Sequence, residues 1–190
     1  MKKQINSIKK IAVMVVVLTA LLSFKVLDEK LFEFSFPERK NTAITINASN
    51  FGDFTKEWKG TDYYYLGTSK DAIICSVYYF KLNKQEQEYM VEPFGGVPMA
   101  GIPMIYFSDN SPLKKYEVNK SGWGNITDDF MFRQCDILEY EGIKIRQKNM
   151  YAYCMFDADL FVSVHLSKEN YTPRDSTAMM QLLNSIKKKK

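Results

Sequence analysis

The chain has 190 residues, of which 46% are hydrophobic and 25% are charged, a composition that predicts one packed domain and excludes a disordered chain. Its formal net charge of +4 comes from the two ends, because residues 1–24 and 187–190 each hold four lysines and no acidic residue. Residues 25–186 hold 18 basic and 22 acidic residues. This net charge of −4 argues against a nucleic-acid partner, which would require a basic surface.

The first 24 residues have the pattern of an export signal. Residues 1–10 contain four lysines, and Ile11–Phe24 is an uncharged apolar stretch of 14 residues that ends before Lys25. As a helix this stretch would measure about 21 Å, less than the roughly 30 Å hydrocarbon core of a bilayer. We therefore predict that residues 1–24 are a signal peptide, cleaved on export to the periplasm, the outer envelope or the medium. Because no A-x-A cleavage site is present, a retained anchor over residues 11–24 is the alternative.

Residues 25–190 are predicted to form a single α+β domain. Alternating apolar and polar residues, or β-branched and aromatic ones, predict the first strands. These strands are expected at 31–36, 43–46, 62–66 and 72–82, the last two forming a hairpin. Phe54 and Trp58 are four residues apart, which predicts a helical turn within residues 50–60. A Gln- and Glu-rich composition predicts a short helix over residues 83–90.

Residues Pro93–Pro103 form an unusual loop with three glycines and three prolines. The loop also carries four large apolar side chains, namely Phe94, Val97, Met99 and Ile102. We hypothesise that these side chains form a binding surface or a lid. The alternative is a turn-rich connector whose apolar residues are buried against the sheet.

The second half of the domain holds a run of strand patterns separated by short polar gaps. Strand candidates lie at 104–107, 131–140, 142–147, 150–156 and 160–167. The last four predict an antiparallel meander, in which Asp157–Asp159 forms the turn between the final two strands.

The C-terminus carries the clearest helix pattern in the chain. Thr172 is suited to the N-cap and Pro173 to the first helical position. The apolar face consists of Met179, Leu182, Leu183 and Ile186. Lysines 187–190 are expected to stabilise the C-terminal end of the helix dipole, and an added contact with anionic lipid is left open. The predicted fold class is α+β: one antiparallel sheet covered by helices, with this amphipathic helix packed on the sheet.

Aromatic residues occur in runs such as Tyr63–Tyr65 and Tyr78–Phe80. Consecutive residues of a strand point to opposite faces of the sheet. Either both faces are therefore buried, or one face displays an aromatic stripe.

Three cysteines, Cys75, Cys135 and Cys154, lie in predicted strands. Two interpretations remain open: three buried thiols, or one disulfide with one thiol left over. The cysteine spacing matches no zinc motif, and the chain has one histidine, His165. We therefore predict neither a metal site nor a cofactor.

Cys154 and His165 provide the one catalytic hypothesis that the sequence offers. They lie on neighbouring strands of a predicted hairpin, and a histidine beside a thiol activates it as a nucleophile. This chemistry requires both side chains on the same face of the sheet, which the sequence does not fix. The alternative places His165 on the exposed face, with Val162, Val164 and Leu166 pointing inward.

Two segments resemble the Mog1/PsbP/DcrB-like group of small α/β proteins. They are the opening strand, FEFSFP, and the closing strand and capped helix, FVSVHLSKENYTPRDSTAMMQLLNSI. The resemblance covers the two ends of the domain. It implies a sheet covered by helices and a binding or assembly factor rather than an enzyme, in a group with several exported bacterial members. The pattern equally fits an exported protein family of the Bacteroidetes type.

From these observations we expect an exported, non-catalytic binding or assembly domain that contacts an envelope protein partner through the loop Pro93–Pro103. Two alternatives remain open. One is a small thiol-dependent enzyme that uses Cys154 and His165, and the other is a domain that binds a lipid or a sugar in a pocket under the loop. Membrane contact is expected only through an uncleaved N-terminal segment.

Overall fold

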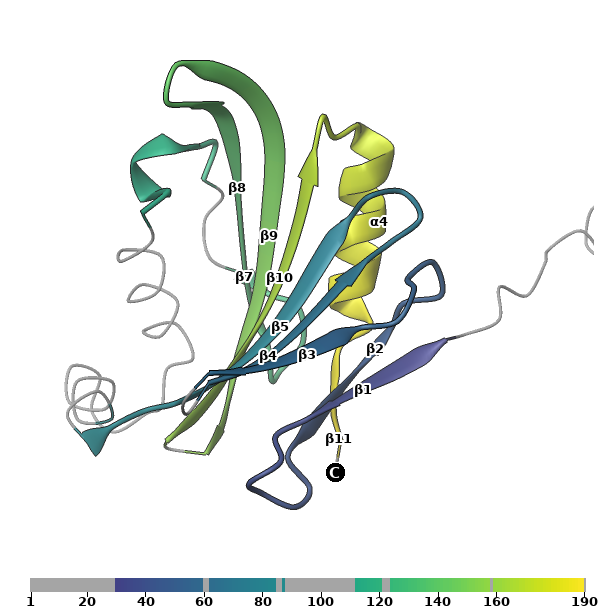
Figure 1. The fold of residues 1–190 in the computed structure, drawn as a ribbon, viewed down its shortest axis with the longest axis vertical. Coiled ribbons are helices and arrows are strands. Elements are labelled where there is room, and N and C mark those ends of the chain that lie inside the picture. Colours follow the sequence, from purple (N-terminus) through teal and green to yellow (C-terminus); the bar gives the residue numbers. More distant parts are fainter. Residues whose placement is uncertain are drawn as a thin grey trace, which may run out of the picture. The chain divides into compact units, whose positions relative to one another are not determined.

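A computed structural model gives the fold of the chain and describes residues 30–59, 62–84, 87, 112–120, 124–157 and 159–189. The chain divides into two compact units, Met1–Lys30 and Leu31–Lys190, and every described residue except Lys30 belongs to the second. The described part of this unit is built mainly of antiparallel strands, with one long helix near the C-terminus (Figure 1). The predicted signal peptide or anchor lies outside the described residues.

The larger sheet has eight strands, and its strands pair antiparallel. In their order across the sheet, seven of them are β3 (Thr55–Lys59), β4 (Asp62–Thr68), β5 (Ile74–Lys81), β10 (Leu160–Glu169), β9 (Ile143–Asp157), β8 (Met131–Tyr140) and β6 (Glu117–Val118). The eighth strand, β7 (Gly124–Asn125), pairs with β8 outside this order. The predicted hairpin β4–β5 is confirmed, and so is the antiparallel order of the predicted meander, although the meander has three strands, β8, β9 and β10, instead of the four expected.

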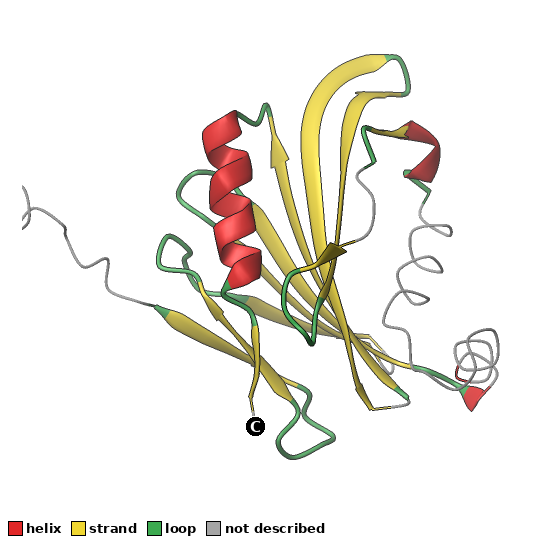
Figure 2. Cartoon of the chain, turned by 180° about the vertical axis from the view of Figure 1, so that it is seen from behind, coloured by secondary structure: helices red, strands yellow, loops and turns green. Residues whose placement is uncertain are grey.

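A smaller sheet and the helix lie against one face of the larger sheet (Figure 2). The smaller sheet has the order β1 (Leu31–Ser35), β2 (Ala43–Asn47) and β11 (Lys187–Lys189), and the helix is α4 (Pro173–Asn184). Phe34 of β1, Ile44 of β2, Val164 of β10 and Leu183 of α4 are fully buried in one shared core. We call this face of the larger sheet the core face and the opposite one the second face.

Two tyrosines of the larger sheet join it to the backbone of the smaller one. The Tyr79 hydroxyl donates to the Phe34 carbonyl at 2.7 Å and accepts from the Ile44 amide at 3.2 Å. The Tyr65 hydroxyl does the same with Ser35, donating to its carbonyl at 2.7 Å and accepting from its amide at 3.2 Å. Since buried backbone groups are costly to leave unpaired, these hydroxyls fix where the smaller sheet lies on the larger.

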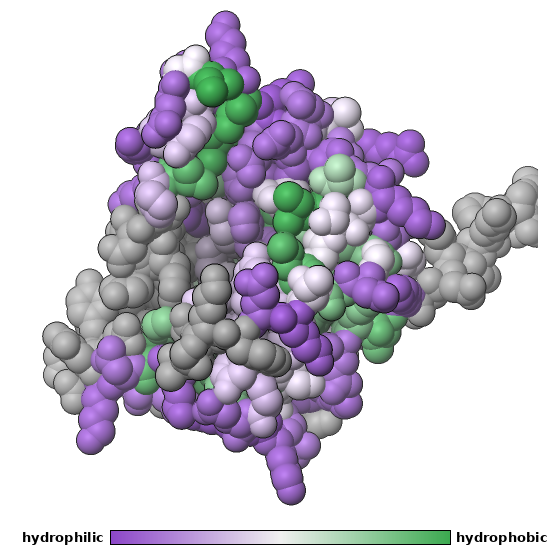
Figure 3. Space-filling model, in the orientation of Figure 1, coloured by the Kyte–Doolittle hydropathy of each residue, from purple (hydrophilic) through white to green (hydrophobic). Residues whose placement is uncertain are grey.

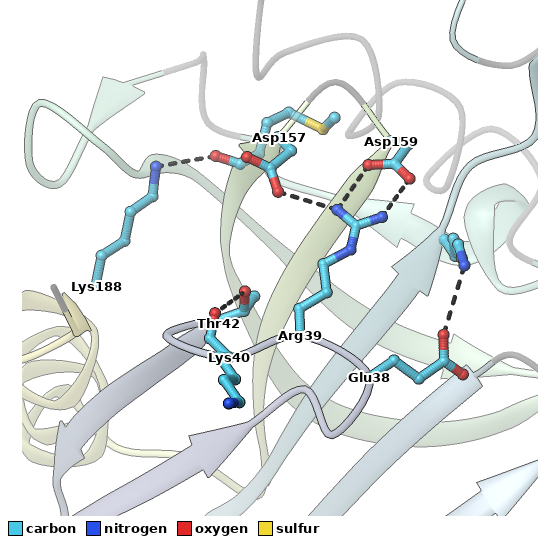
Figure 4. A network of polar contacts seen from close by, with 9 residues as sticks. Glu38, Arg39, Lys40, Thr42, Asp157, Asp159 and Lys188 are labelled. Atoms are coloured by element: carbon cyan, nitrogen blue, oxygen red, sulfur yellow. Dashed lines mark hydrogen bonds and ion pairs between the residues drawn. The ribbon is translucent and has the colours of Figure 1, made fainter.

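Arg39, in the turn between β1 and β2, ties this turn to the connection between β9 and β10 (Figure 4). Its guanidinium binds both oxygens of the Asp159 carboxylate and lies 2.9 Å from an oxygen of Asp157. The pKa of the Asp159 carboxyl is held below its ordinary value, chiefly by this hydrogen bond from Arg39. Nearby, the Lys188 ammonium of β11 donates to the Met155 carbonyl of β9 at 2.9 Å.

The C-terminal helix begins as the sequence predicts. The Thr172 hydroxyl accepts from the Asp175 amide at 3.3 Å, and the Thr172 amide donates to the Asp175 carboxylate at 2.8 Å, a reciprocal capping box. Pro173 occupies the first turn. Met179 and Leu183 of the expected apolar face are buried in the core.

Two expectations about local structure are wrong. Residues 50–60 form no helical turn in their described part, because Thr55–Lys59 is strand β3 and pairs with β4. Phe54 precedes this strand, and its ring takes the space above Gly67, where a Cβ atom would lie 2.6 Å from it. The two strands expected at 142–147 and 150–156 form one strand, β9, which runs without a break through Lys148 and Asn149.

The expected layer of helices and the expected role of the C-terminal lysines also need correction. In the described residues α4 is the one α-helix that packs on the larger sheet. The smaller sheet, β1, β2 and β11, covers the rest of the core face. The fold is therefore α+β with more sheet than the expected layer of helices. Lysines 187–189 form strand β11 on β2 and not the last turn of the helix. The helix expected over 83–90 and the strand expected at 104–107 lie mostly or wholly outside the described residues.

Candidate binding surface

The loop residues Phe94, Val97, Met99 and Ile102 lie outside the described residues. The hypothesis of a binding surface in the loop Pro93–Pro103, and the pocket for a lipid or sugar beneath it, therefore stay predictions. The described part of the chain offers another candidate, at the end of the β8–β9 hairpin.

The β8–β9 hairpin ends in a tight two-residue turn. Glu141 and Gly142 both have positive φ angles, 50° and 82°, as in the type I′ turn that matches the twist of two antiparallel strands. The turn places Tyr140 directly opposite Ile143. Pairing of β9 with β10 stops at Gln147, and the Asn170 amide, just after β10, donates to the Arg146 carbonyl at 2.6 Å, so Ile143–Ile145 extend past this support (Figure 1).

Apolar side chains gather on one side of this hairpin end. Residues 136, 138 and 140 of β8 alternate onto one face, while the register with β9 shifts by one residue between Ile137 and Glu139. The pairings add Val118, opposite Asp136, and Ile143, opposite Tyr140. The exposed fractions are 38% for Val118, 47% for Leu138, 37% for Tyr140 and 66% for Ile143. Tyr116, from the turn η2 (Lys114–Tyr116), packs edge-on against Tyr140 with ring centroids 4.8 Å apart.

We call Tyr116, Val118, Leu138, Tyr140 and Ile143 the tip patch. Figure 3 shows hydrophobic side chains gathered at this end of the molecule. Single exposed apolar residues are ordinary on protein surfaces, whereas adjoining ones mark sites of interaction. The tip patch is therefore the candidate binding surface of the described residues.

Polar contacts brace the base of the tip patch. Lys148 lies 2.7 Å from the Asp136 carboxylate, which also accepts from the Asn119 side chain at 3.1 Å. Burial opposes ionisation of Asp136, but the hydrogen bonds from Lys148 and Asn119 outweigh it and hold its pKa below the ordinary value. Arg146 lies 4.8 Å over the Tyr171 ring. These contacts fix the β8–β9 hairpin beneath its exposed end.

The second face of the larger sheet carries a cluster of polar and aromatic residues around His165. The His165 ring stacks on Tyr151 with centroids 4.3 Å apart, and its Nε2 lies 3.0 Å from the Asn149 side-chain oxygen. Arg133 lies 6.0 Å over the Tyr151 ring and pairs with the buried Glu117 carboxylate. Among the described residues, the buried Asn149 amide nitrogen has no hydrogen-bond partner. Burial lowers the His165 pKa to about 4, so the ring is neutral at pH 7.

The catalytic pair considered from the sequence is not formed. Cys154 pairs in register with Val162 and packs in the core, whereas His165 pairs with Tyr151 three residues further along β10. Side chains three residues apart on a strand point to opposite faces, so the sheet lies between Cys154 and His165. The inward placement of Val162, Val164 and Leu166 is confirmed, although His165 is half-buried rather than exposed.

All three cysteines are free and buried, which confirms the first of the two interpretations. Burial raises the pKa of each thiol to about 12. Since the thiolate is the reactive form, these thiols are unreactive at neutral pH in the folded chain. In the described residues no group of three or more His, Cys, Asp or Glu side chains is placed to hold a metal ion.

The aromatic runs supply both faces of the larger sheet. Tyr63, Tyr65 and Tyr79 pack with the core on the core face. On the second face, Tyr64 contacts Tyr78 with centroids 6.1 Å apart.

Sequence reasoning did not identify the tip patch. The signal in the sequence is the pair Glu141-Gly142 between strands that keep large apolar residues next to the turn. A hairpin turn normally ends strands whose apolar side chains face the core. The pattern alone does not show that the hairpin extends beyond its cover.

Comparison with known proteins identifies no family. No family model matches the chain, and no curated protein matches it, so the resemblance to the Mog1/PsbP/DcrB-like group stays a prediction. A crystal structure of a protein from Bacteroides thetaiotaomicron is similar over 77% of this chain, with 10% sequence identity and a TM-score of 0.44. This chain covers 45% of that protein. Among the residues with described structure, no helix is long and apolar enough to span a membrane.

Proposed function

We propose that the chain is an exported, non-catalytic binding or assembly domain that contacts a protein partner in the cell envelope. The observation that carries the binding role in this proposal is the tip patch, in which four adjoining apolar side chains are each more than a third exposed. A folded domain gains stability by burying such groups, so their exposure on a braced hairpin marks a binding surface.

The chemistry of the thiols favours binding over catalysis. The sheet separates Cys154 from His165, and burial raises the Cys154 pKa to about 12. A nucleophilic cysteine needs a lowered pKa and an adjacent base. A thiol-dependent enzyme that uses Cys154 would therefore have no access to His165 as its base.

The loop Pro93–Pro103 is the second surface in this proposal. Its apolar residues Phe94, Val97, Met99 and Ile102 are suited to burial against a protein. We assign the protein contact to this loop on the basis of its composition.

Crosslinking in cells, followed by mass spectrometry of the purified tagged protein, tests the proposed function. One protein should be captured reproducibly, and the double substitution Phe94→Ala and Met99→Ala should abolish its capture. Leu31→Ser is the matched control, because Leu31 is 64% exposed and lies outside both surfaces. Capture that is unchanged in the loop variant, or capture of nothing, would contradict the assignment of the loop to a protein partner.

A further inference from the structure

We propose that the tip patch docks on an anionic lipid surface. This inference rests on the proposed function in one respect, namely that the patch is a binding surface, and it names what the patch binds. It adds a membrane contact by the folded domain to the protein contact assigned to the loop Pro93–Pro103.

The shape of the hairpin end favours a lipid occupant. Residues Ile143–Ile145 lie beyond the part of β9 that β10 and Asn170 hold, and Figures 1 and 2 show the hairpin extending past α4 as well. A stable protein interface buries roughly 800 Å² on each partner over 20–30 residues. A projecting end with five apolar residues is small for that purpose, whereas a bilayer interface covers such an end without a complementary surface.

The side chains of the tip patch are of the kinds found at membrane interfaces. Leu138 and Ile143 supply the apolar surface that enters the acyl boundary. Tyr116 and Tyr140 have an apolar ring and a polar hydroxyl, which suits them to the level of the headgroups. The Glu141-Gly142 turn gives the hairpin a defined end, since both φ angles are fixed in the left-handed region.

The charge around the tip patch is opposite in sign to the charge of the rest of the domain. Residues 112–120 and 138–146 hold five basic and three acidic residues, a net charge of +2. Residues 25–186 as a whole have a net charge of −4, so the remainder has −6. One of the three acids, Glu117, is buried and paired with Arg133, which leaves Glu139 and Glu141 as the exposed acids of the tip.

Two lysines of the tip are available to lipid headgroups. Lys115 and Lys144 are exposed, and in the described part of the chain no carboxylate lies within ion-pair distance of either one. Lys115 lies 4.7 Å over the Tyr116 ring, so its charge is beside the apolar surface that would enter the membrane. Each lysine or arginine near an anionic bilayer contributes about 1 kcal/mol, or roughly a fivefold gain in affinity.

An environment-sensitive fluorophore attached to the tip tests this inference on the full chain. Ile143→Cys places a thiol in the patch, and Ile74→Cys, at a 44% exposed apolar residue outside it, is the matched control. The three native thiols are buried, with pKa values of about 12, so they do not compete for the label. A retained segment 1–24 would bring both labels to the vesicles equally, and the difference between the two positions reports on the tip.

Vesicles of phosphatidylcholine mixed with phosphatidylglycerol should raise the emission of the label at position 143 and leave the label at position 74 unchanged. Phosphatidylcholine vesicles alone should have no such effect. With Lys115→Gln and Lys144→Gln added, about 25-fold more anionic lipid should be needed for the same response.

Equal responses at the two positions, or a response that does not depend on the two lysines, would overturn the inference. The label at position 143 could instead show no response to vesicles, while Leu138→Ser and Ile143→Ser abolish capture of the crosslinked protein. This result would show that the tip binds a protein, and it would leave the proposed function intact. If two copies of the chain associate through the same residues and the label shows no response to vesicles, the tip binds a second copy of this chain. A vesicle response without any captured protein would support the inference and contradict the protein contact.

Discussion

The acid stability of the fold depends on His165 in a way that can be measured, because the chain has one histidine. Burial lowers its pKa to about 4 in the folded state, against about 6.5 in an unfolded chain. As the pH falls below about 6.5, the unfolded state binds a proton that the native state does not, and the free energy of unfolding decreases. Between pH 7 and pH 5 this one group should lower the free energy of unfolding by ~2 kcal/mol.

The variant His165→Phe isolates this effect. Phenylalanine keeps a ring on Tyr151 but cannot bind a proton, and the loss of the hydrogen bond to Asn149 shifts its stability by an amount that does not depend on pH in this range. Urea denaturation at pH 7, 6 and 5 should show the decrease in the natural chain and its absence in the variant. Carboxyl groups titrate in both proteins, so their contribution cancels in the comparison.

Proton NMR provides an independent measurement, because one histidine gives one Cε1–H resonance. The resonance should keep the chemical shift of a neutral ring down to about pH 5. A folded-state midpoint near 6.5, or an equal loss of stability in His165→Phe, would refute the reasoning that burial on the second face keeps this ring neutral.

Four further predictions concern the contacts that hold the fold together. Tyr79→Phe should lower the free energy of unfolding by about 2 kcal/mol, measured by urea denaturation, because it removes the two buried hydrogen bonds by which this hydroxyl joins the larger sheet to the smaller one. Gly67→Ala should cost ~1–3 kcal/mol, since a Cβ atom there meets a phenylalanine ring, whereas Gly52→Ala, with nothing within 4 Å, should be close to neutral. Arg39→Met should lower stability by about 1 kcal/mol, and Lys40→Met, an exposed charge in the same turn, should not. The three thiols should not react with a thiol reagent at pH 8 in the native chain and should all react in denaturant, and fast labelling of the native chain would contradict their burial.

The strands that the sequence predicts correctly are those whose pattern is set by one covered face. Leu31–Ser35 alternates because Phe34 enters the core, and Val162, Val164 and Leu166 of β10 alternate for the same reason. The helix at the C-terminus is predictable because its cap is local, with Thr172 and Asp175 only three residues apart. Such features depend on neighbours in the chain and therefore appear in the sequence.

The features that the sequence misses depend on contacts between distant residues. Lysines 187–189 have no strand propensity of their own and become strand β11 because the backbone of β2 offers them a free edge. The spacing of Phe54 and Trp58 suggests a helix, but β4 supplies a strand partner for Thr55–Lys59. In both places tertiary pairing outweighs local preference.

The candidate site shows the same division. The turn at Glu141-Gly142 is readable, because a glycine between two strand patterns is a local signal in the sequence. The exposure of Leu138 and Ile143 is not, because it depends on where β10 stops pairing with β9. The separation of Cys154 from His165 was also open until the register of β9 and β10 was known.

The same register explains how this chain could retain free thiols after export to an oxidising compartment. Cys75 and Cys154 both face the core, but β10 lies between their strands, and they pair there with Leu166 and Val162. Cys135 pairs with Asn149, which pairs with Ser167, and this places it on the second face. No two cysteines are cross-strand neighbours, and a disulfide requires Cα atoms within about 7 Å and facing Cβ atoms. Oxidation to a disulfide would therefore require the sheet to open, so an odd number of cysteines is compatible with the predicted export of this domain.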